Sequence, residues 1–234
     1  MPDRWEHAFS DPAAAQATAA KIFRQALTHD EVSALRKFSV EVRDEKNATA
    51  TVSADHGGRR TTYLNSSPSA CTDPLILKLR RIMEAADEAS SWNLLSEPCN
   101  IRCIEFHECT AAGDGTSGVE TGAPGREHYD AGSLITLDLM LSESESFDGG
   151  TFGTLEADGT MATHALSRGD AVVFVSHKYH TVSPVTRGTR EVLVMELWRG
   201  PVRHCPHRCL KPEGECTYRG DEAECELLPS LEPD

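Results

Sequence analysis

Two histidines and an aspartate are the residues of this chain best suited to chemistry. His128 and Asp130 stand in the tripeptide HYD, and His180 follows the apolar run DAVVFVS. Side chains alternate along an extended strand, so the first two point to one face while Tyr129 points away. Two imidazoles and one carboxylate on one face of an octahedral ion form a ligand set suited to Fe(II), with positions left open. An isolated H-x-D pair is more often a surface or structural feature, so the predicted iron site depends on the rest of the pattern.

An arginine adds the second part of that pattern. The segment HTVSPVTRGTR runs from His180 to Arg190, and FDGGTF precedes it in the chain. A planar guanidinium binds a carboxylate through two parallel hydrogen bonds, and a buried dianion needs such a partner. With HYD, FDGGTF and this segment in order, the chain resembles the Fe(II)- and 2-oxoglutarate-dependent dioxygenases of the prolyl 4-hydroxylase-like branch, over about residues 101 to 198.

The resemblance implies a role for each residue of the motifs. His128, Asp130 and His180 would be the iron ligands, and Arg190 would pair with the distal carboxylate of 2-oxoglutarate. Thr136, in LITLDL, matches a position that helps to hold 2-oxoglutarate in relatives, although a β-branched residue in a strand needs no such explanation. The chain departs from the family at Cys109, where relatives carry a tyrosine that lines the co-substrate pocket.

The resemblance also implies the reaction. Fe(II), 2-oxoglutarate and O2 would hydroxylate an unactivated C–H bond with release of succinate and CO2, and ascorbate is a further candidate cofactor. A peptidyl proline is the first substrate to consider, and another side chain or a small molecule is the alternative. A catalytically inactive jelly-roll binding module, or a cupin-like metalloenzyme that does not use 2-oxoglutarate, is disfavoured by Arg190 at its matched spacing.

Three neighbouring polar residues are given structural roles instead. His177 lies three residues before His180, so in an extended segment the two point to opposite faces. His107 alternates with Phe106 in a strand and is expected to be a satisfied core or edge histidine. Lys178 is expected to be exposed.

The elements that must position these residues are short strands behind N-terminal helices. Helices are predicted at 12–26, 27–38 and 72–92, β-like segments at 38–54 and 59–65, and an antiparallel β unit from Ile101 onward. We therefore expect a mainly β fold with N-terminal helices (α+β) and a double-stranded β-helix, or jelly-roll, core. The predicted organisation is a helical support region at 1–100, a dioxygenase core at 101–200 and a Cys/His-rich acidic appendage at 201–234. The Gly-rich segment 110–125 is suited to a lid.

Composition narrows the classes of partner. The chain has 234 residues and a formal net charge of -14, which disfavours a sequence-independent grip on nucleic acid. No apolar run approaches the roughly 20 residues of a membrane span, and the N-terminus lacks the features of a signal peptide. We expect a cytoplasmic or otherwise intracellular protein whose partner is a peptide or small-molecule substrate.

The C-terminal region holds a separate candidate site. Four cysteines and two histidines there offer ligands for zinc: His204, Cys205, His207, Cys209, Cys216 and Cys225. Their spacing is not that of the standard C-x-x-C pairs, so disulfides or reduced thiols remain alternatives.

Overall fold

The computed structural model describes residues 14–15, 17–45, 51–52, 58–111 and 129–205 of the chain. The helices are α2 (His29–Glu45) and α3 (Pro74–Ser90), with 3-10 turns η1 (Leu64–Ser66), η2 (Ala70–Thr72) and η3 (Ser144–Ser146). The strands are β1 (Lys21–Phe23), β2 (Thr51–Val52), β3 (Arg59–Tyr63), β4 (Asn100–Thr110), β5 (Ile135–Met140), β6 (Phe147–Gly149), β7 (Phe152–Leu155), β8 (Met161–His164), β9 (Ala171–Val175), β10 (His180–Val182) and β11 (Val185–Trp198).

Two antiparallel sheets make up the β framework. The larger sheet has the order β1-β9-β5-β11-β4-β3-β2, with β6 also paired to β11. The smaller sheet has the order β10-β7-β8. The long strand β11 pairs with β4, β5 and β6, so it is the element that ties the framework together.

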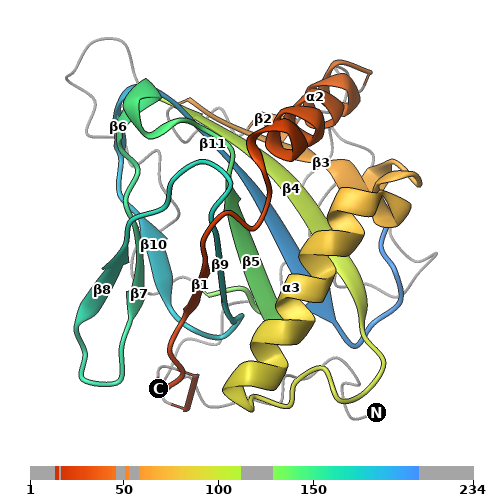
Figure 1. Ribbon diagram of the computed structural model, residues 1–234, viewed down its shortest axis with the longest axis vertical. Coiled ribbons are helices and arrows are strands. Elements are labelled where there is room, and N and C mark those ends of the chain that lie inside the picture. The colour runs from red at the N-terminus through yellow and green to blue at the C-terminus, as the bar shows by residue number, and fades with distance from the viewer. Residues whose placement is uncertain (1–13, 16, 46–50, 53–57, 112–128, 206–234) are drawn as a thin grey trace.

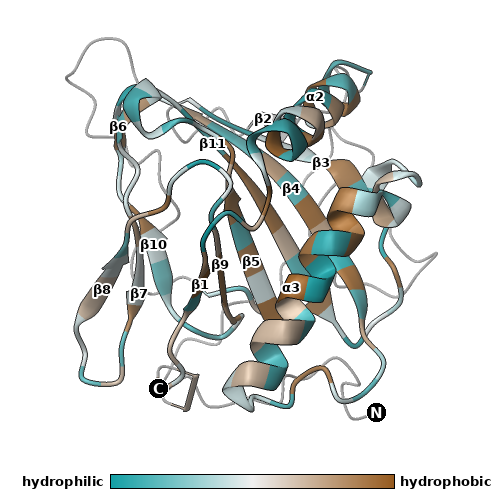
Figure 2. Ribbon diagram, viewed as in Figure 1, coloured by the Kyte–Doolittle hydropathy of each residue, from teal (hydrophilic) through white to brown (hydrophobic). Residues whose placement is uncertain are grey.

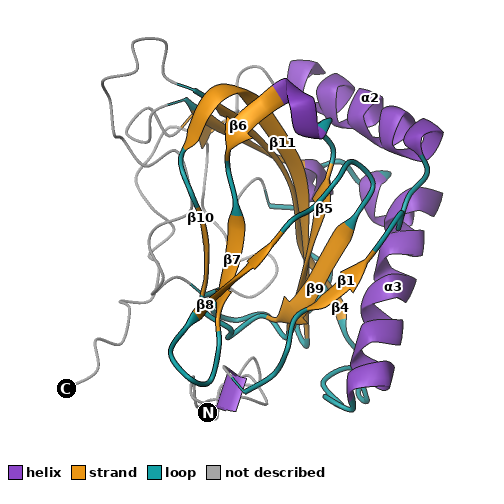
Figure 3. Cartoon of the chain, turned by 60° about the vertical axis from the view of Figure 1, so that its left-hand side comes forward, coloured by secondary structure: helices purple, strands orange, loops and turns teal. Residues whose placement is uncertain are grey.

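The elements form three layers. Helices α2 and α3 cover one face of the larger sheet, and the smaller sheet lies on its other side (Figure 1). Figure 3 shows the same arrangement from a second direction, with β7, β8 and β10 apart from the helices. The mainly β class with supporting helices is confirmed, and the double-stranded β-helix winding and the region boundaries stay predictions.

The two long helices begin where the sequence predicts. Thr28 and Glu31 form a capping box at the start of α2: the Thr28 N–H donates to Glu31 at 2.8 Å, and the Glu31 N–H donates to Thr28 Oγ1 at 3.3 Å. Asp73 caps α3 by accepting from the Leu75 N–H at 2.8 Å, and Pro74 occupies the first helical position. None of the described helices is both long and apolar enough to span a membrane.

Two segment predictions were wrong. The predicted helix at 12–26 contains strand β1, because Lys21–Phe23 pairs with β9 and gains a tertiary partner that outweighs the helix propensity of the alanines. The β-like segment predicted at 38–54 is instead helical as far as Glu45, where α2 ends, and of its later described residues Thr51–Val52 form strand β2. In the first case the packing partner decided between helix and strand.

The strands of the larger sheet have one apolar face and one face that mixes polar and apolar side chains. Brown and teal bands alternate along β4 and β11 in Figure 2. On the helix side, the buried side chains of one cluster come from four strands and both helices, including Leu35, Leu79, Phe106, Leu139, Val173 and Leu193. The other face looks toward the smaller sheet and carries buried polar residues, among them Thr136, Arg190 and Glu196.

Candidate active site

Asp130 lies immediately before β5 and is held by hydrogen bonds. Its side chain is 1% exposed, its N–H donates to the Ser176 carbonyl at 2.9 Å, and its carbonyl accepts from the Ser133 N–H at 3.3 Å. The Thr136 hydroxyl donates to Asp130 Oδ2 at 2.8 Å. Since both backbone and side chain are fixed, the carboxylate is presented in one orientation.

His180 begins β10 and faces this carboxylate. Its Nε2 lies 3.9 Å from Asp130 Oδ2, and its Nδ1 lies 3.1 Å from the Lys178 carbonyl. A carbonyl only accepts, so Nδ1 carries a proton, and Nε2 is the ring nitrogen that faces Asp130. The rings of Phe174 and Phe152 lie 4.9 and 5.8 Å from the imidazole ring and form an apolar wall beside it.

The donor set at this point fits an iron ion. One imidazole nitrogen and one carboxylate oxygen at this separation can both contact a cation at metal–ligand distances of about 2 Å. Two buried ligands of these types suit non-haem Fe(II). His128, the predicted third ligand, lies outside the described residues, so the structure brings together Asp130 and His180 alone.

Arg190 lies on β11 and is buried on the inner face of the larger sheet. Its side chain is 2% exposed, and Nε and Nη2 have no hydrogen-bond partner among the described residues. Burial lowers the pKa of Arg190 from its ordinary value, and the charge of Asp138 offsets part of that effect. Buried guanidinium donors without partners are costly, which is expected where a carboxylate ligand completes the site.

Gly150 makes room for this arginine. A Cβ at Gly150 would lie 2.6 Å from Arg190 Cδ, and the residue has a φ of +60°. Glycine is therefore required both for its backbone conformation and for the close approach of the arginine side chain. Gly150 of FDGGTF thus leaves the space that the Arg190 side chain fills.

Two other residues, Arg187 and Cys109, bear on the surroundings of Arg190. Arg187 is an exposed surface residue that pairs with Asp148 at 2.6 Å, so it does not share the interior with Arg190. Cys109 lies opposite Arg190 in the β4–β11 register and is 6% exposed. Burial raises the pKa of the Cys109 thiol, and the Arg190 charge partly opposes this rise. The thiol therefore lies beside Arg190, at the position where the resemblance implies a tyrosine in relatives.

Thr136 is placed beside the metal ligand. Its hydroxyl is fully buried, donates to Asp130 and lies 2.9 Å from Ser176 Oγ. The structure thus gives Thr136 a contact with Asp130, and its predicted contact with 2-oxoglutarate stays a prediction.

Of the residues given structural roles, one was misplaced. Lys178 is 0% exposed and its Nζ lies 3.0 Å from Glu156, so the expectation of an exposed lysine was wrong. A carboxylate partner within the fold makes its burial tolerable. His107 is buried and satisfied as predicted, with Glu105 at 2.8 Å and Thr61 at 2.9 Å. His177 packs edge-on against Tyr129 at 4.7 Å between ring centroids.

Sequence reasoning missed a group of buried acids on the inner face. Glu105, Asp138 and Glu196 are 1%, 6% and 0% exposed, and all three lie on the same face as Arg190 by strand alternation. The signal was available in IEFHEC, where Glu105 and His107 alternate with apolar residues.

The C-terminal candidate site lies mostly outside the described residues. His204 and Cys205 are described, and each contacts Asn65 through a hydrogen bond: His204 Nδ1 with the Asn65 carbonyl at 3.1 Å, and the Cys205 carbonyl with Asn65 Nδ2 at 3.2 Å. His207, Cys209, Cys216 and Cys225 are not described. The predicted lid at 110–125 also falls outside from residue 112 onward.

Sequence comparison with known proteins finds relatives over a part of the chain. No family model matches it. A PKHD-type hydroxylase of Acidovorax ebreus (strain TPSY) is 32% identical over 111 residues, which are 46% of this chain and 44% of the relative. The chain therefore matches less than half of the length of that curated relative.

Solved structures share the fold over most of the chain. A Pseudomonas putida prolyl-4-hydroxylase has a TM-score of 0.54 at 19% identity and covers 82% of this chain and 100% of its own. An oxidoreductase of the 2OG-Fe(II) oxygenase family from Burkholderia pseudomallei has a TM-score of 0.54 at 14% identity, covering 83% of this chain and 92% of its own. The resemblance to the 2-oxoglutarate/Fe(II) oxygenases of the prolyl 4-hydroxylase-like branch is confirmed.

Proposed function

We propose that this chain is an Fe(II)- and 2-oxoglutarate-dependent dioxygenase that hydroxylates an unactivated C–H bond, with a peptidyl proline as the first substrate. The observation that carries the proposal is Arg190, a buried guanidinium on the inner face of the larger sheet. Two of its donor atoms, Nε and Nη2, have no hydrogen-bond partner within the described part of the chain. A site with a metal at Asp130 and His180 and a guanidinium at Arg190 would suit a keto diacid such as 2-oxoglutarate.

Each group in the interior has a task in this proposal. Asp130 and His180 hold the metal together with His128. Iron, when bound, supplies the activation of O2 that the amino acids themselves lack. The Lys178 carbonyl fixes the tautomer of His180, and the Thr136 hydroxyl fixes the carboxylate of Asp130.

The co-substrate end is preorganised. Arg190 is held in place by burial and by the space that Gly150 leaves, so its guanidinium is ready to bind the far carboxylate of 2-oxoglutarate without rearrangement. The rings of Phe152 and Phe174 line the side of His180 and reduce the access of water.

Peptidyl proline as substrate is supported by the names of the relatives. The Pseudomonas putida neighbour is a prolyl-4-hydroxylase, and the curated relatives are PKHD-type hydroxylases. We further propose an intracellular protein without a nucleic-acid partner, in keeping with the net charge of -14. Ascorbate as a reductant and zinc at the C-terminal cysteines remain part of the proposal to be tested separately.

The test is succinate formation by the purified protein with Fe(II), ascorbate and 2-oxoglutarate. Proline-containing peptides should raise succinate above the peptide-free rate and gain one oxygen atom on proline, as seen by mass spectrometry. Slow succinate formation that no such peptide stimulates would rule out proline as the substrate, and the dioxygenase assignment would stand. If no succinate forms under any of these conditions, the dioxygenase assignment is ruled out as well. Metal analysis of the same protein should find zinc beside iron if the C-terminal cysteines bind it.

A further inference from the structure

Arg59, Cys109 and Arg190 form one row across three neighbouring strands. Arg59 on β3 is the Cα partner of Cys109 on β4, and Cys109 is the Cα partner of Arg190 on β11. Neighbouring strands are about 4.8 Å apart, so the two arginine Cα atoms are separated by roughly 10 Å, with the small thiol side chain between them. Two side chains as long as arginine can reach one ligand from the two sides of such a gap.

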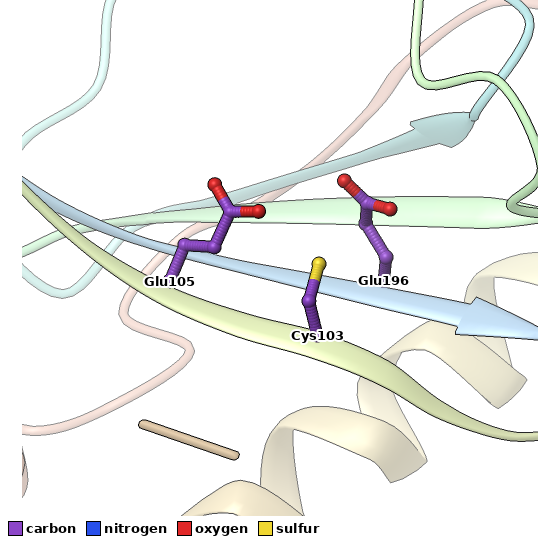
Figure 4. A group of neighbouring side chains, drawn as sticks. All are labelled: Cys103, Glu105 and Glu196. Carbon is purple, nitrogen blue, oxygen red and sulfur yellow. The ribbon is translucent and has the colours of Figure 1, made fainter. Parts of the chain in front are cut away.

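The row lies on the inner face of the larger sheet. Figure 4 shows Cys103, Glu105 and Glu196 leaving β4 and β11 on the side away from α3. Cys109 follows Glu105 by four residues and Arg190 precedes Glu196 by six, and the register shift of β11 comes only after Glu196. Because side chains alternate along a strand, Cys109 and Arg190 share that face. The β3 partner of Cys109 shares it too, since paired residues of an antiparallel sheet project to the same side.

A contact with His107 directs the Arg59 side chain along this face. Arg59 Nη2 lies 3.3 Å from His107 Nδ1, and a guanidinium only donates, so Nδ1 accepts. The other ring nitrogen of His107 lies 2.8 Å from the buried Glu105, which holds the imidazole in place. The next residue of β3, Arg60, is exposed on the opposite face and lies 3.8 Å from Glu108. The half-buried Arg59 is therefore the arginine of this strand that is held on the inner face.

The guanidinium of Arg59 acts on the charge of Arg190. Burial is the main cause that lowers the pKa of Arg190. Asp138 opposes this lowering, and the positive charge of Arg59 adds to it. Two like charges on one side of a sheet repel each other, and the repulsion is weakly screened where water is excluded. An anion between the two guanidinium groups would remove this cost.

An independent observation points to a ligand in this place. Arg190 is 2% exposed, and within the ranges that the structure describes its Nε and Nη2 have no hydrogen-bond partner. Buried donor atoms are nearly always satisfied in folded proteins, so these two call for an acceptor. A carboxylate is the acceptor that matches a guanidinium in charge and in shape.

The surroundings of the row favour more than one donor group. Cys109 belongs to a buried apolar cluster with Met140, Phe147 and Val185. A carboxylate against such a surface loses water, and the loss is costly unless its oxygens receive several hydrogen bonds. Each carboxylate oxygen can accept about two, so one guanidinium leaves acceptor positions for another.

We infer that Arg59 is a second binding residue for the distal carboxylate of 2-oxoglutarate, which it holds together with Arg190 beside Cys109. The inference rests on the proposed function and adds to it a residue from β3, outside the segment that carries the motifs. Arg190 is the more deeply buried of the two arginines, so it contributes the larger share of the affinity.

Two ligands that differ only at their distal end test this role. 2-Oxoglutarate and 2-oxopentanoate share the keto acid that would contact the metal, but 2-oxopentanoate ends in a methyl group where 2-oxoglutarate has its second carboxylate. The affinity of each is measured by calorimetry on the full chain loaded with Fe(II), without oxygen. The ratio of the two affinities reports recognition of the distal carboxylate separately from turnover.

Variants of β3 assign the recognition to Arg59. Arg59→Ala should weaken 2-oxoglutarate binding about tenfold, the size of one charge-assisted hydrogen bond, and should leave the affinity for 2-oxopentanoate within about twofold. Arg59→Lys should keep part of the preference, because the charge remains while the planar fork is lost. Arg60→Ala, one residue along the same strand, is the matched control and should bind both ligands like the wild type.

The outcomes separate this inference from the proposed function. Undiminished 2-oxoglutarate affinity in Arg59→Ala, together with weakened binding in Arg190→Ala, would overturn the role of Arg59 and leave the proposed function standing. An equal loss for both ligands in Arg59→Ala would also overturn it, because it would indicate a structural role. If the wild type does not bind 2-oxoglutarate, or binds it no better than 2-oxopentanoate, the proposed function itself is contradicted and the inference falls with it.

Discussion

The two faces of the larger sheet come from the same strands but differ in kind. On the helix side, Ile104 and Phe106 of β4 pack with Leu193 and Met195 of β11 in a continuous apolar cluster. On the inner side, the intervening positions of the same strands carry Glu105, His107, Arg190 and Glu196. Because strand side chains alternate, one segment supplies both surfaces.

This difference separates stability from function along each strand. The apolar face gains free energy by removing carbon from water, whereas the inner face places charged groups where their burial is costly. Such costs are common where a ligand completes the interactions. Substitutions at neighbouring positions of one strand should therefore have different consequences.

The largest expected effect is on catalysis, at the inner end of the sheet. Asp130→Ala removes a proposed metal ligand and should reduce succinate formation below detection, while the thermal unfolding transition remains cooperative. The same change at the exposed turn residue Asp158 should leave turnover near the wild-type value. Full turnover of Asp130→Ala would show that the metal is held elsewhere.

On the helix side, the expected effect is on stability. Leu193→Ala leaves a cavity in the apolar cluster and should lower the free energy of unfolding by about 2–5 kcal/mol. Urea unfolding measures this, and the folded variant should keep its affinity for 2-oxoglutarate. Leu77→Ala, on the exposed side of α3, should change stability far less. A large loss of 2-oxoglutarate affinity in folded Leu193→Ala would mean that the faces are not separable.

A smaller effect is expected where a strand residue supports a metal ligand. Thr136→Val keeps the shape of the side chain and removes the hydroxyl that contacts Asp130, so Fe(II) affinity should fall about 10- to 100-fold. Metal titration checks this, with Thr163→Val on the exposed strand β8 as the control. If the metal affinity of Thr136→Val is unchanged, the hydroxyl does not support metal binding and Thr136 contributes to packing alone.

The sequence sufficed for features that depend on local pattern. Local pattern predicted an antiparallel β unit from Ile101 onward, and the capping residues predicted where α2 and α3 begin. Arg190 was identified by its type and its spacing from His180, and the structure buries it. The resemblance covered the same region and gave each residue its expected role.

Features that depend on long-range pairing were not predicted. Strand β1 was taken for helix because its partner β9 lies far along the chain. The meeting of Cys103, Glu105 and Glu196 depends on the register of β4 against β11, which no local pattern encodes. Burial of Lys178 likewise follows from Glu156, which a turn and two strands separate from it in sequence.

The central claim is that one interior binds metal at Asp130 and His180 and the far carboxylate of 2-oxoglutarate at Arg190. Calorimetric titration of 2-oxoglutarate into the Fe(II) protein without oxygen tests it most directly. Arg190→Ala should weaken binding by about 2–5 kcal/mol, with part of the loss recovered in Arg190→Lys. Arg187→Ala, at the surface pair with Asp148, should bind like the wild type. Undiminished 2-oxoglutarate affinity in both Arg190 variants would contradict the account.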